Sequence, residues 1–233
     1  LDIGILQSLY RTGEVSDLVA DYGHIIVDEC HHLSAYSFEQ IMKKAKAKYV
    51  LGLTATPVRK DGHHPIIIMQ CGPIRFRVGA KSAAETRPFE HFMVPRMTET
   101  ELSNVTDQPT IQQVYRLLAS DKNRNKMIAE DVVQAVQEGR SPLLLTERTD
   151  HLEQLTELLE GQIRNVVVLR GGMGKKQRVA VAKSLDDIGD NRERVIVATG
   201  RYIGEGFDDA RLDTLFLALP ISWRGTLQQY AGR

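Results

Sequence analysis

The sequence predicts an α/β fold whose parallel sheets are divided between two lobes. Short apolar runs rich in β-branched residues end abruptly at acidic, small or hydroxyl residues, and they alternate with stretches of helical periodicity. The clearest of these runs occupy 25–27, 49–53, 142–145, 165–169 and 194–198. Such alternation is typical of parallel sheets, because a helix must carry the chain back before the next strand begins. An aperiodic segment at 97–110 predicts a linker between a lobe at 1–96 and a lobe at 111–233.

The composition is that of an ordinary globular protein. The 233 residues include 30 Lys and Arg against 30 Asp and Glu, so a basic surface for a nucleic acid would have to be a local stripe. The two cysteines are too few for a disulfide framework and indicate a reducing cytoplasm. The sequence shows no signal peptide and no membrane-spanning run. Because it lacks an initiator Met and opens on an apolar run, we expect a piece of a longer protein whose first lobe is incomplete at its N-terminus.

Two adjacent acids follow the first of the clear strands. The run 25–27 ends at Asp28 and Glu29, which places two carboxylates at the carboxyl edge of a sheet, where open α/β folds bind ligands. Asp28 can hold a hydrated Mg²⁺, and Glu29 can orient a water against a phosphate. The alternative is a pair of solvated acids in a loop, one of them capping the next helix.

A second polar strand end favours the site over the solvated loop. The run 49–53 ends at Thr54 and Thr56 and is stopped by Pro57. Right-handed crossovers keep consecutive strands parallel, so both strand ends should lie at the same edge.

The segments Asp28-Glu29-Cys30-His31 and Thr54-Ala55-Thr56 resemble motifs II and III of superfamily-two helicases, in the DExH branch that holds repair helicases and restriction-enzyme motors. The resemblance implies two RecA-like lobes that hydrolyse ATP between them. It implies that Asp28 binds Mg²⁺ and that Glu29 is the catalytic base. His31 would couple the nucleotide state to the other lobe, and Thr54 and Thr56 would link the two binding sites.

The rest of the first lobe reads as short strands and helices. We predict helices at 16–21 and 37–48, and strands at 1–6, 66–69, 74–78 and 89–95. Gln7 and Ser8 follow the first strand, where the family usually contacts the nucleic-acid backbone, so the resemblance makes them candidate contacts. A core strand followed by an ordinary loop is the alternative.

Histidines are concentrated near the acid pair, which raises the question of a transition-metal site. Five of the seven histidines lie near the predicted site, and these are His24, His31, His32, His63 and His64. Zinc sites usually show spacings such as C-x₂-C or H-x₃-H, and neither occurs here. Loop and coupling roles are therefore favoured for these histidines.

The second lobe repeats the strand–helix rhythm. Apolar positions at helical spacing predict a helical region over 111–136, which Gly139 ends as a cap residue. A strand then ends at Thr146, and the loop that follows reaches Arg148. By the resemblance, Thr146 and Arg148 are candidate contacts to the nucleic-acid backbone. The remaining elements are strands at 165–169, 194–198 and 212–219 and helices around 152–159 and 179–185.

The stretch from Gly171 to Lys176 looks like a phosphate-binding loop, since it follows a strand and opens a helix. The ATP-binding pattern G-x₄-G-K-[ST] would require Gly at Leu169 and a hydroxyl at Lys176, so we reject it as an ATP cradle. Its amides and lysines suit a nucleic-acid phosphate at the helix start. Gly171, Gly172 and Lys175 are therefore candidate backbone contacts.

Two further segments resemble motifs V and VI of the same family. In the glycine-rich loop after the third strand of this lobe, the resemblance places Thr199 on the nucleic-acid backbone and Gly206 and Asp208 on the nucleotide. The last residues read Q-x-x-G-R. Gln229 would contact the nucleotide side of the cleft, and Arg233 would lie on the γ-phosphate as an arginine finger.

No Walker A loop occurs in the chain, and the family places that loop ahead of the first residue seen here. Without its lysine, amides and hydroxyl, ATP loses most of its phosphate contacts. We therefore expect the chain alone to bind ATP poorly and not to turn it over.

The leading hypothesis is a motor fragment of an ATP-dependent helicase or translocase that uses ATP and Mg²⁺ and moves on a nucleic acid, DNA in preference to RNA. A catalytically inactive, helicase-like binding scaffold is the second hypothesis; a Walker A sequence upstream would support the motor, and its absence would support the scaffold. A nuclease or metal hydrolase built on the histidine-rich loops is the third. Tight metal binding that depends on His63 and His64 would favour it.

Overall fold

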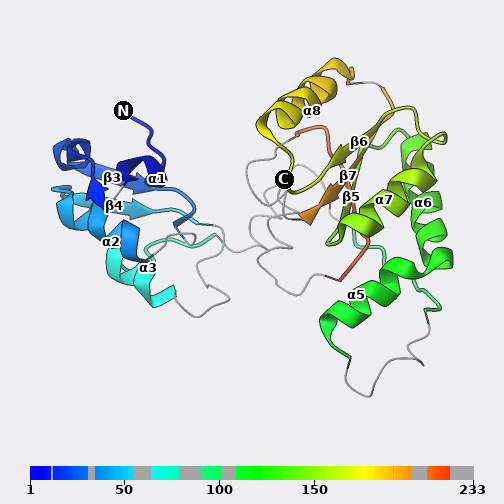
Figure 1. Ribbon diagram of the computed structural model, residues 1–233, viewed down its shortest axis with the longest axis horizontal. Coiled ribbons are helices and arrows are strands. Elements are labelled where there is room, and N and C mark those ends of the chain that lie inside the picture. Colours follow the sequence, from blue (N-terminus) through cyan, green and yellow to red (C-terminus); the bar gives the residue numbers. More distant parts are fainter. Residues whose placement is uncertain are drawn as a thin grey trace. The chain divides into compact units, whose positions relative to one another are not determined.

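The computed structural model describes residues 1–11, 13–30, 35–54, 64–78, 90, 92–100, 109–190, 192–200 and 209–220. The chain divides into two compact units, Leu1–His91 and Phe92–Arg233 (Figure 1). Within the described residues, no helix is both long enough and apolar enough to cross a membrane.

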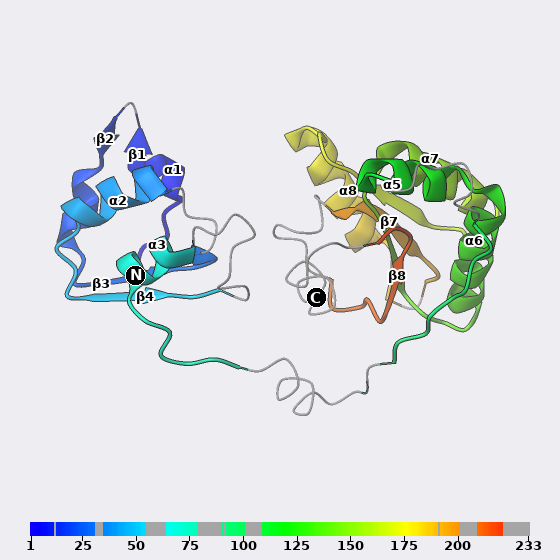
Figure 2. The same cartoon turned by 90° about the horizontal axis from the view of Figure 1, so that it is seen from below.

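The first unit is built on a pair of parallel strands. Strand β3 (His24–Val27) pairs with β4 (Tyr49–Gly52), and His24 lies opposite Tyr49. Helices α2 (Ala35–Lys44) and α3 (His64–Cys71) cover one face of this pair, as Figure 2 shows. The parallel direction follows because α2 returns the chain between the two strands.

The two faces of the β3–β4 pair differ in burial. On the helix side, Phe38 and Ile41 of α2 and Ile67 of α3 are buried. The alternate strand positions expose large apolar side chains, which are Ile26, Tyr49 and Leu51. Because side chains alternate along a strand, one face carries the core and the other remains open.

Short elements precede the two strands. They are α1 (Leu6–Leu9), an antiparallel hairpin of β1 (Tyr10–Arg11) and β2 (Glu14–Val15), and a 3₁₀ helix, η1 (Asp17–Asp21). The helix predicted at 16–21 is thus present as a 3₁₀ turn, and the helix predicted at 37–48 begins and ends earlier, as α2.

Several strands predicted for the first unit were wrong. Residues 1–5 have no regular structure, and the run 66–69 lies inside α3. Pro65 stands in the first turn of α3, where a proline is tolerated, and Ile67 packs inward while Met69 is 81% exposed. Residues 74–78 are irregular, as are the described residues of 89–95. Isoleucine-rich runs favour strands by propensity alone, and here tertiary packing overrode that preference.

The second unit contains a four-stranded parallel sheet in the order β6-β7-β5-β8. The strands are β5 (Pro142–Thr146), β6 (Val166–Leu169), β7 (Val195–Thr199) and β8 (Thr214–Leu217). Helices α5 (Ile111–Ser120), α6 (Lys122–Gln137) and α7 (Thr149–Leu159) lie on one side of the sheet and α8 (Lys175–Asp187) on the other (Figure 1). The prediction of an α/β fold with parallel sheets is confirmed.

The central strands are buried on both faces. Leu144 of β5 and Val197 of β7 pack with Val132 of α6 and Leu155 of α7. Their neighbours along the strands point the other way and form a second cluster that includes Leu185 of α8; these are Leu143, Leu145, Ile196 and Ala198. This two-sided burial explains why the strands of the second unit read as continuous apolar runs.

Side chains cap the helices at the start of the second unit. The Thr110 hydroxyl accepts the Gln113 amide and begins α5, and the Asp121 carboxylate accepts the Arg124 amide at 3.0 Å and begins α6. Gly139 follows α6 with φ +81°, as the sequence predicted. Part of the predicted linker belongs to this unit, since Thr100 donates a hydrogen bond to Asp121.

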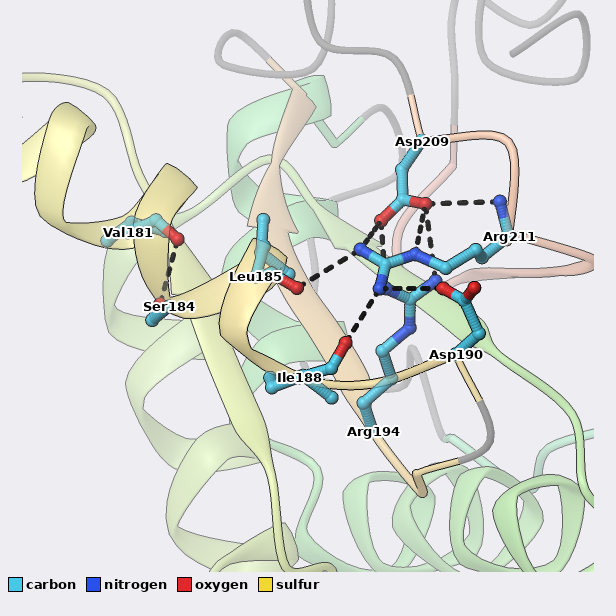
Figure 3. Close-up of polar contacts among 8 residues, drawn as sticks. All are labelled: Val181, Ser184, Leu185, Ile188, Asp190, Arg194, Asp209 and Arg211. Atoms are coloured by element: carbon cyan, nitrogen blue, oxygen red, sulfur yellow. Dashed lines mark hydrogen bonds and ion pairs between the residues drawn. The ribbon is translucent and has the colours of Figure 1, made fainter.

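A buried ion cluster ties the segment before β8 to both β7 and α8 (Figure 3). Arg194 is 2% exposed and donates to the Asp209 carboxylate at 2.9 and 3.3 Å. Arg211 donates to the same carboxylate and also to the Leu185 and Ile188 carbonyls at the end of α8. Burial opposes ionisation of Asp209, but the hydrogen bonds from the two arginines hold its pKa below the usual value.

Removing the charge of Asp209 should destabilise the second unit strongly. In Asp209→Asn, the Arg194 guanidinium stays buried without its counter-ion, which typically costs about 3–5 kcal/mol. Asp190→Asn is the matched control, because Asp190 reaches the same cluster at 3.5 Å from Arg211 but is 85% exposed, and it should cost less than about 1 kcal/mol. Urea unfolding followed by circular dichroism measures both, and equal small losses would contradict the assignment.

Candidate functional site

The acid pair lies in a sharp turn directly after β3. The Asp28 carboxylate is exposed, and its Oδ1 accepts the Glu29 amide at 2.9 Å. Glu29 is partly buried and has φ +46°, a left-handed conformation that costs a non-glycine residue about 1–2 kcal/mol. Such outliers persist where the surrounding structure holds them, and they cluster at functional sites.

Hydrogen bonds continue the β3–β4 pairing beyond both strand ends. Leu53 donates its amide to Val27 at 2.8 Å, and Cys30 donates its amide to Leu53 at 3.0 Å. These bonds hold the loop of Asp28 and Glu29 beside Thr54. The structure therefore brings these three predicted site residues to one sheet edge, whereas His31 and Thr56 lie outside the described residues.

The acid pair fits the coordination that Mg²⁺ prefers. Mg²⁺ usually keeps several waters and is held by one or two carboxylates together with substrate phosphates. Asp28 offers an exposed carboxylate at the edge of the sheet. Within the described part of the chain, no three His, Cys, Asp or Glu side chains come close enough to hold a metal ion by themselves.

Gln7 and Ser8 lie on the short helix α1 of the first unit. Both residues are exposed. The Ser8 hydroxyl donates to the Ile5 carbonyl at 2.6 Å, so its proton is used within the local turn.

In the second unit, the ends of β6 and β7 are joined by a hydrogen bond. The Thr199 hydroxyl accepts the Gly171 amide at 3.2 Å, and Thr199 is only 7% exposed. Gly172 has φ +84°, which turns the chain toward the start of α8 at Lys175. Gly171 and Gly172 are exposed. The candidate contacts Thr199, Gly171, Gly172 and Lys175 therefore belong to one continuous corner of the sheet.

A buried polar network lies beneath the end of β5. The Thr146 hydroxyl is 2.9 Å from His151 Nδ1, and His151 Nε2 is 2.9 Å from Asn125 Oδ1. Asn125 uses its amide group to donate to the Ala119 carbonyl at 2.8 Å. Its Oδ1 therefore accepts from His151 Nε2, and the neutral imidazole accepts the Thr146 proton at Nδ1.

This network changes the role expected for Thr146. With 2% exposure and its hydroxyl bonded to His151, Thr146 is placed to hold the loop rather than to contact a ligand directly. His151 and Asn125 were missed at the sequence level, because they lie among the apolar positions of α7 and α6 with no spacing that marks them.

The loop above this network carries opposed charges. Arg148 donates from Nε and Nη2 to the Asp150 carboxylate at 2.9 and 2.5 Å, and this pair stands at the start of α7. Burial raises the pKa of the neighbouring Glu147. The Arg148 guanidinium is thus oriented in advance at the carboxyl edge of the sheet.

The predicted nucleotide contacts of the second unit lie outside the described residues. These are Gly206, Asp208, Gln229 and Arg233.

Comparison with known proteins relates the chain to nucleic-acid motors. The family model of the type III restriction enzyme res subunit matches residues 3–59. A mimivirus protein (Acanthamoeba polyphaga mimivirus) that is named a putative ATP-dependent RNA helicase is 26% identical over 99% of this chain and 44% of its own length. A DNA 3′–5′ translocase of Sulfurisphaera tokodaii is 38% identical over 26% of this chain and 14% of its own length. The chain thus spans less than half the length of these relatives. The crystal structure of T4 UvsW aligns with 92% of this chain and 42% of its own, at 17% identity and a TM-score of 0.46.

Acidification should destabilise the second unit through His151. The imidazole is fully buried, and this burial lowers its pKa from 6.5 to about 4. The positive charges of Arg124 and Arg148 also lower the pKa, whereas the negative charge of Asp150 raises it. Between pH 6.5 and pH 4 the unfolded chain binds a proton at His151 that the folded chain does not. The stability that comes from the neutral imidazole is therefore complete above the unfolded pKa and is lost as the pH falls toward 4. We expect a loss of about 3 kcal/mol, measured by urea unfolding over this range.

The variant His151→Gln serves as the control for this titration. It retains the other ionisable groups but lacks the imidazole, so its free energy of unfolding should fall less steeply between these pH values. Parallel curves for the two proteins would show that His151 is not the group responsible.

Proposed function

We propose that this chain, which belongs to the superfamily-two helicases and translocases, forms part of an ATP-driven motor that moves along a nucleic-acid backbone. The observation that carries the proposal is the edge of the β3–β4 sheet, where Asp28 and Glu29 lie beside Thr54 in the segment that the restriction-enzyme family model matches. An acid pair directly after a parallel strand, at the carboxyl edge of a sheet, is an arrangement that suits nucleotide hydrolysis.

Each acid has a distinct part in the proposed reaction. Asp28 would hold a hydrated Mg²⁺ through its exposed carboxylate, and the ion would supply positive charge beside the phosphates of ATP. Glu29 orients the attacking water and accepts its proton. Because Glu29 occupies a left-handed turn, its backbone is fixed in one direction relative to the strand. The coupling roles go to His31, Thr54 and Thr56, which follow β3 and β4.

The second unit supplies the backbone contacts in this proposal. The joined corner of Thr199, Gly171, Gly172 and Lys175 lies at the start of α8, where a phosphate is favoured by the helix dipole. Arg148, oriented by Asp150, adds a guanidinium at the same edge, and Gln7 and Ser8 add contacts from the first unit. Such contacts are independent of base sequence and weaken as salt rises.

The remaining nucleotide contacts are proposed from the motif resemblance. They are Gly206 and Asp208 in the glycine-rich loop, with Gln229 and the arginine finger Arg233 near the end of the chain. DNA is the proposed nucleic acid along which the motor moves. The mimivirus relative is named for RNA and the translocase for DNA, so binding to single-stranded DNA and RNA of the same sequence should be compared directly.

The Glu29→Gln variant of the intact protein should lose ATP hydrolysis and keep ATP binding. The substitution removes the base and preserves size, so kcat should fall by a factor of about 10²–10⁴. Nucleic-acid-stimulated ATPase assays and equilibrium binding of labelled ATP measure the two effects. Glu39→Gln is the matched control, because Glu39 is a partly exposed acid on α2 that pairs only with Lys43 in the described contacts.

Undiminished turnover in Glu29→Gln would remove Glu29 from the reaction. Nucleic-acid binding by an intact protein that hydrolyses no ATP even with native Glu29 would instead favour a binding scaffold.

The 233-residue chain by itself should not turn over ATP. It contains no G-x₄-G-K-[ST] sequence, and the lysine, amides and hydroxyl of that loop supply most contacts to the phosphates. Phosphate release measured with the purified chain, ATP, Mg²⁺ and single-stranded DNA should stay at the level of a no-protein control. Steady turnover would contradict the expectation.

A further inference from the structure

The two cysteines of the chain meet beside the acid pair. Cys30 follows Glu29 directly, and Cys71 is the last residue of α3. Both are free thiols; Cys30 is 2% exposed, and Cys71 is partly exposed. Residues distant in sequence are therefore brought together at the point where the strand β3 ends.

Gly52 makes this approach possible. A side chain on Gly52 would place its Cβ 3.0 Å from Cys71 Sγ and 3.1 Å from Cys30 Sγ, so both sulphur atoms border the same small space over β4. The two thiols are close enough for each to influence the pKa of the other. A disulfide requires two sulphur atoms that can approach one another, and here both border one space.

The surroundings of the two thiols slow their oxidation. Burial raises the pKa of the Cys71 thiol to about 11 and also raises that of Cys30, so few thiolates exist at neutral pH. A thiolate is the species that attacks a disulfide, and the pair should therefore react slowly. Cys71 is the more accessible sulphur and is the expected site of first attack.

We propose that Cys30 and Cys71 are a thiol modification site. A small-molecule disulfide such as oxidised glutathione oxidises the two thiols to a reversible internal Cys30–Cys71 disulfide, and this cross-link inhibits the ATP hydrolysis proposed above. Cys71 attacks the glutathione disulfide and releases one glutathione thiol. Cys30 then attacks Cys71 and releases the second. Two protein thiols are oxidised, one small-molecule disulfide is reduced, and the two protons pass to the departing thiolates.

The inhibition follows from where the cross-link would act. Cys30 is already fixed by its amide bond to Leu53, and Glu29 beside it is held in a left-handed turn. A covalent link from Cys30 to α3 would remove the remaining freedom of this turn to adjust when the phosphates bind. This part of the inference rests on the proposed function, whereas formation of the disulfide does not.

The first experiment tests the disulfide alone. The full chain is incubated with oxidised glutathione at about pH 8.5, which raises the thiolate fraction, and is then alkylated and measured by intact and peptide mass spectrometry. The native chain should lose two hydrogens and yield a linked Cys30–Cys71 peptide, which dithiothreitol should reverse. Cys71→Ser and Cys30→Ser should give no internal link. If the native chain yields mixed glutathione adducts or cross-linked dimers and no internal link, the proposed site is overturned.

The second experiment tests inhibition in the intact protein. Oxidised protein should show ATPase activity about tenfold or more below that of reduced protein, with recovery after dithiothreitol. Cys71→Ser is the control, because Cys71 is outside the proposed catalytic machinery and its activity should be insensitive to oxidation. A linked but fully active protein would refute the inhibition and leave the motor assignment standing. If the intact protein forms the disulfide but hydrolyses no ATP even after the disulfide is reduced, the motor assignment and the inhibition are both refuted. The modification site would still stand.

Discussion

Parallel strand pairing is the constraint on which both units depend. In β3 and β4, and in all four strands of the second unit, each strand delivers its following loop to the same edge. Asp28 and Thr54 meet in this way, as do Thr199 and Gly171, although each pair is separated in sequence by a helix. An antiparallel pairing would have sent alternate loops to opposite edges. The positions of the candidate site residues thus follow from the direction of the strands.

Polar side chains act as supports at both ends of the second unit's sheet. At the carboxyl edge, Thr146, His151 and Asn125 form an uncharged chain of hydrogen bonds under the β5 loop. At the opposite edge, where β7 and β8 begin, the Asp209 carboxylate joins two arginines. Buried polar groups are favourable only when their hydrogen bonds are made. The β5 loop, which carries Arg148, is therefore held from below by groups that need never touch a ligand.

The sequence predicted the second unit much better than the first, for a physical reason. Runs buried on both faces, such as 142–145, leave an unambiguous apolar signature, and the strands appear within a few residues of their expected bounds. The run 66–69 carries the same signature but packs as a helix after Pro65. The acid pair was visible because it directly follows a strand. The partners of Thr146 and Asp209 were not, since they are chosen by tertiary contact between residues far apart in sequence.

The open apolar face of the first unit has a consequence for motion. Two strands with one covered face bury little surface, and small sheets of this kind are marginally stable. Local opening should therefore cost less free energy around β3 and β4 than around the four-stranded sheet, so backbone amides there should exchange with solvent sooner. The acid pair would then be carried by the more deformable half of the chain, and the corner at Thr199 by the more rigid one.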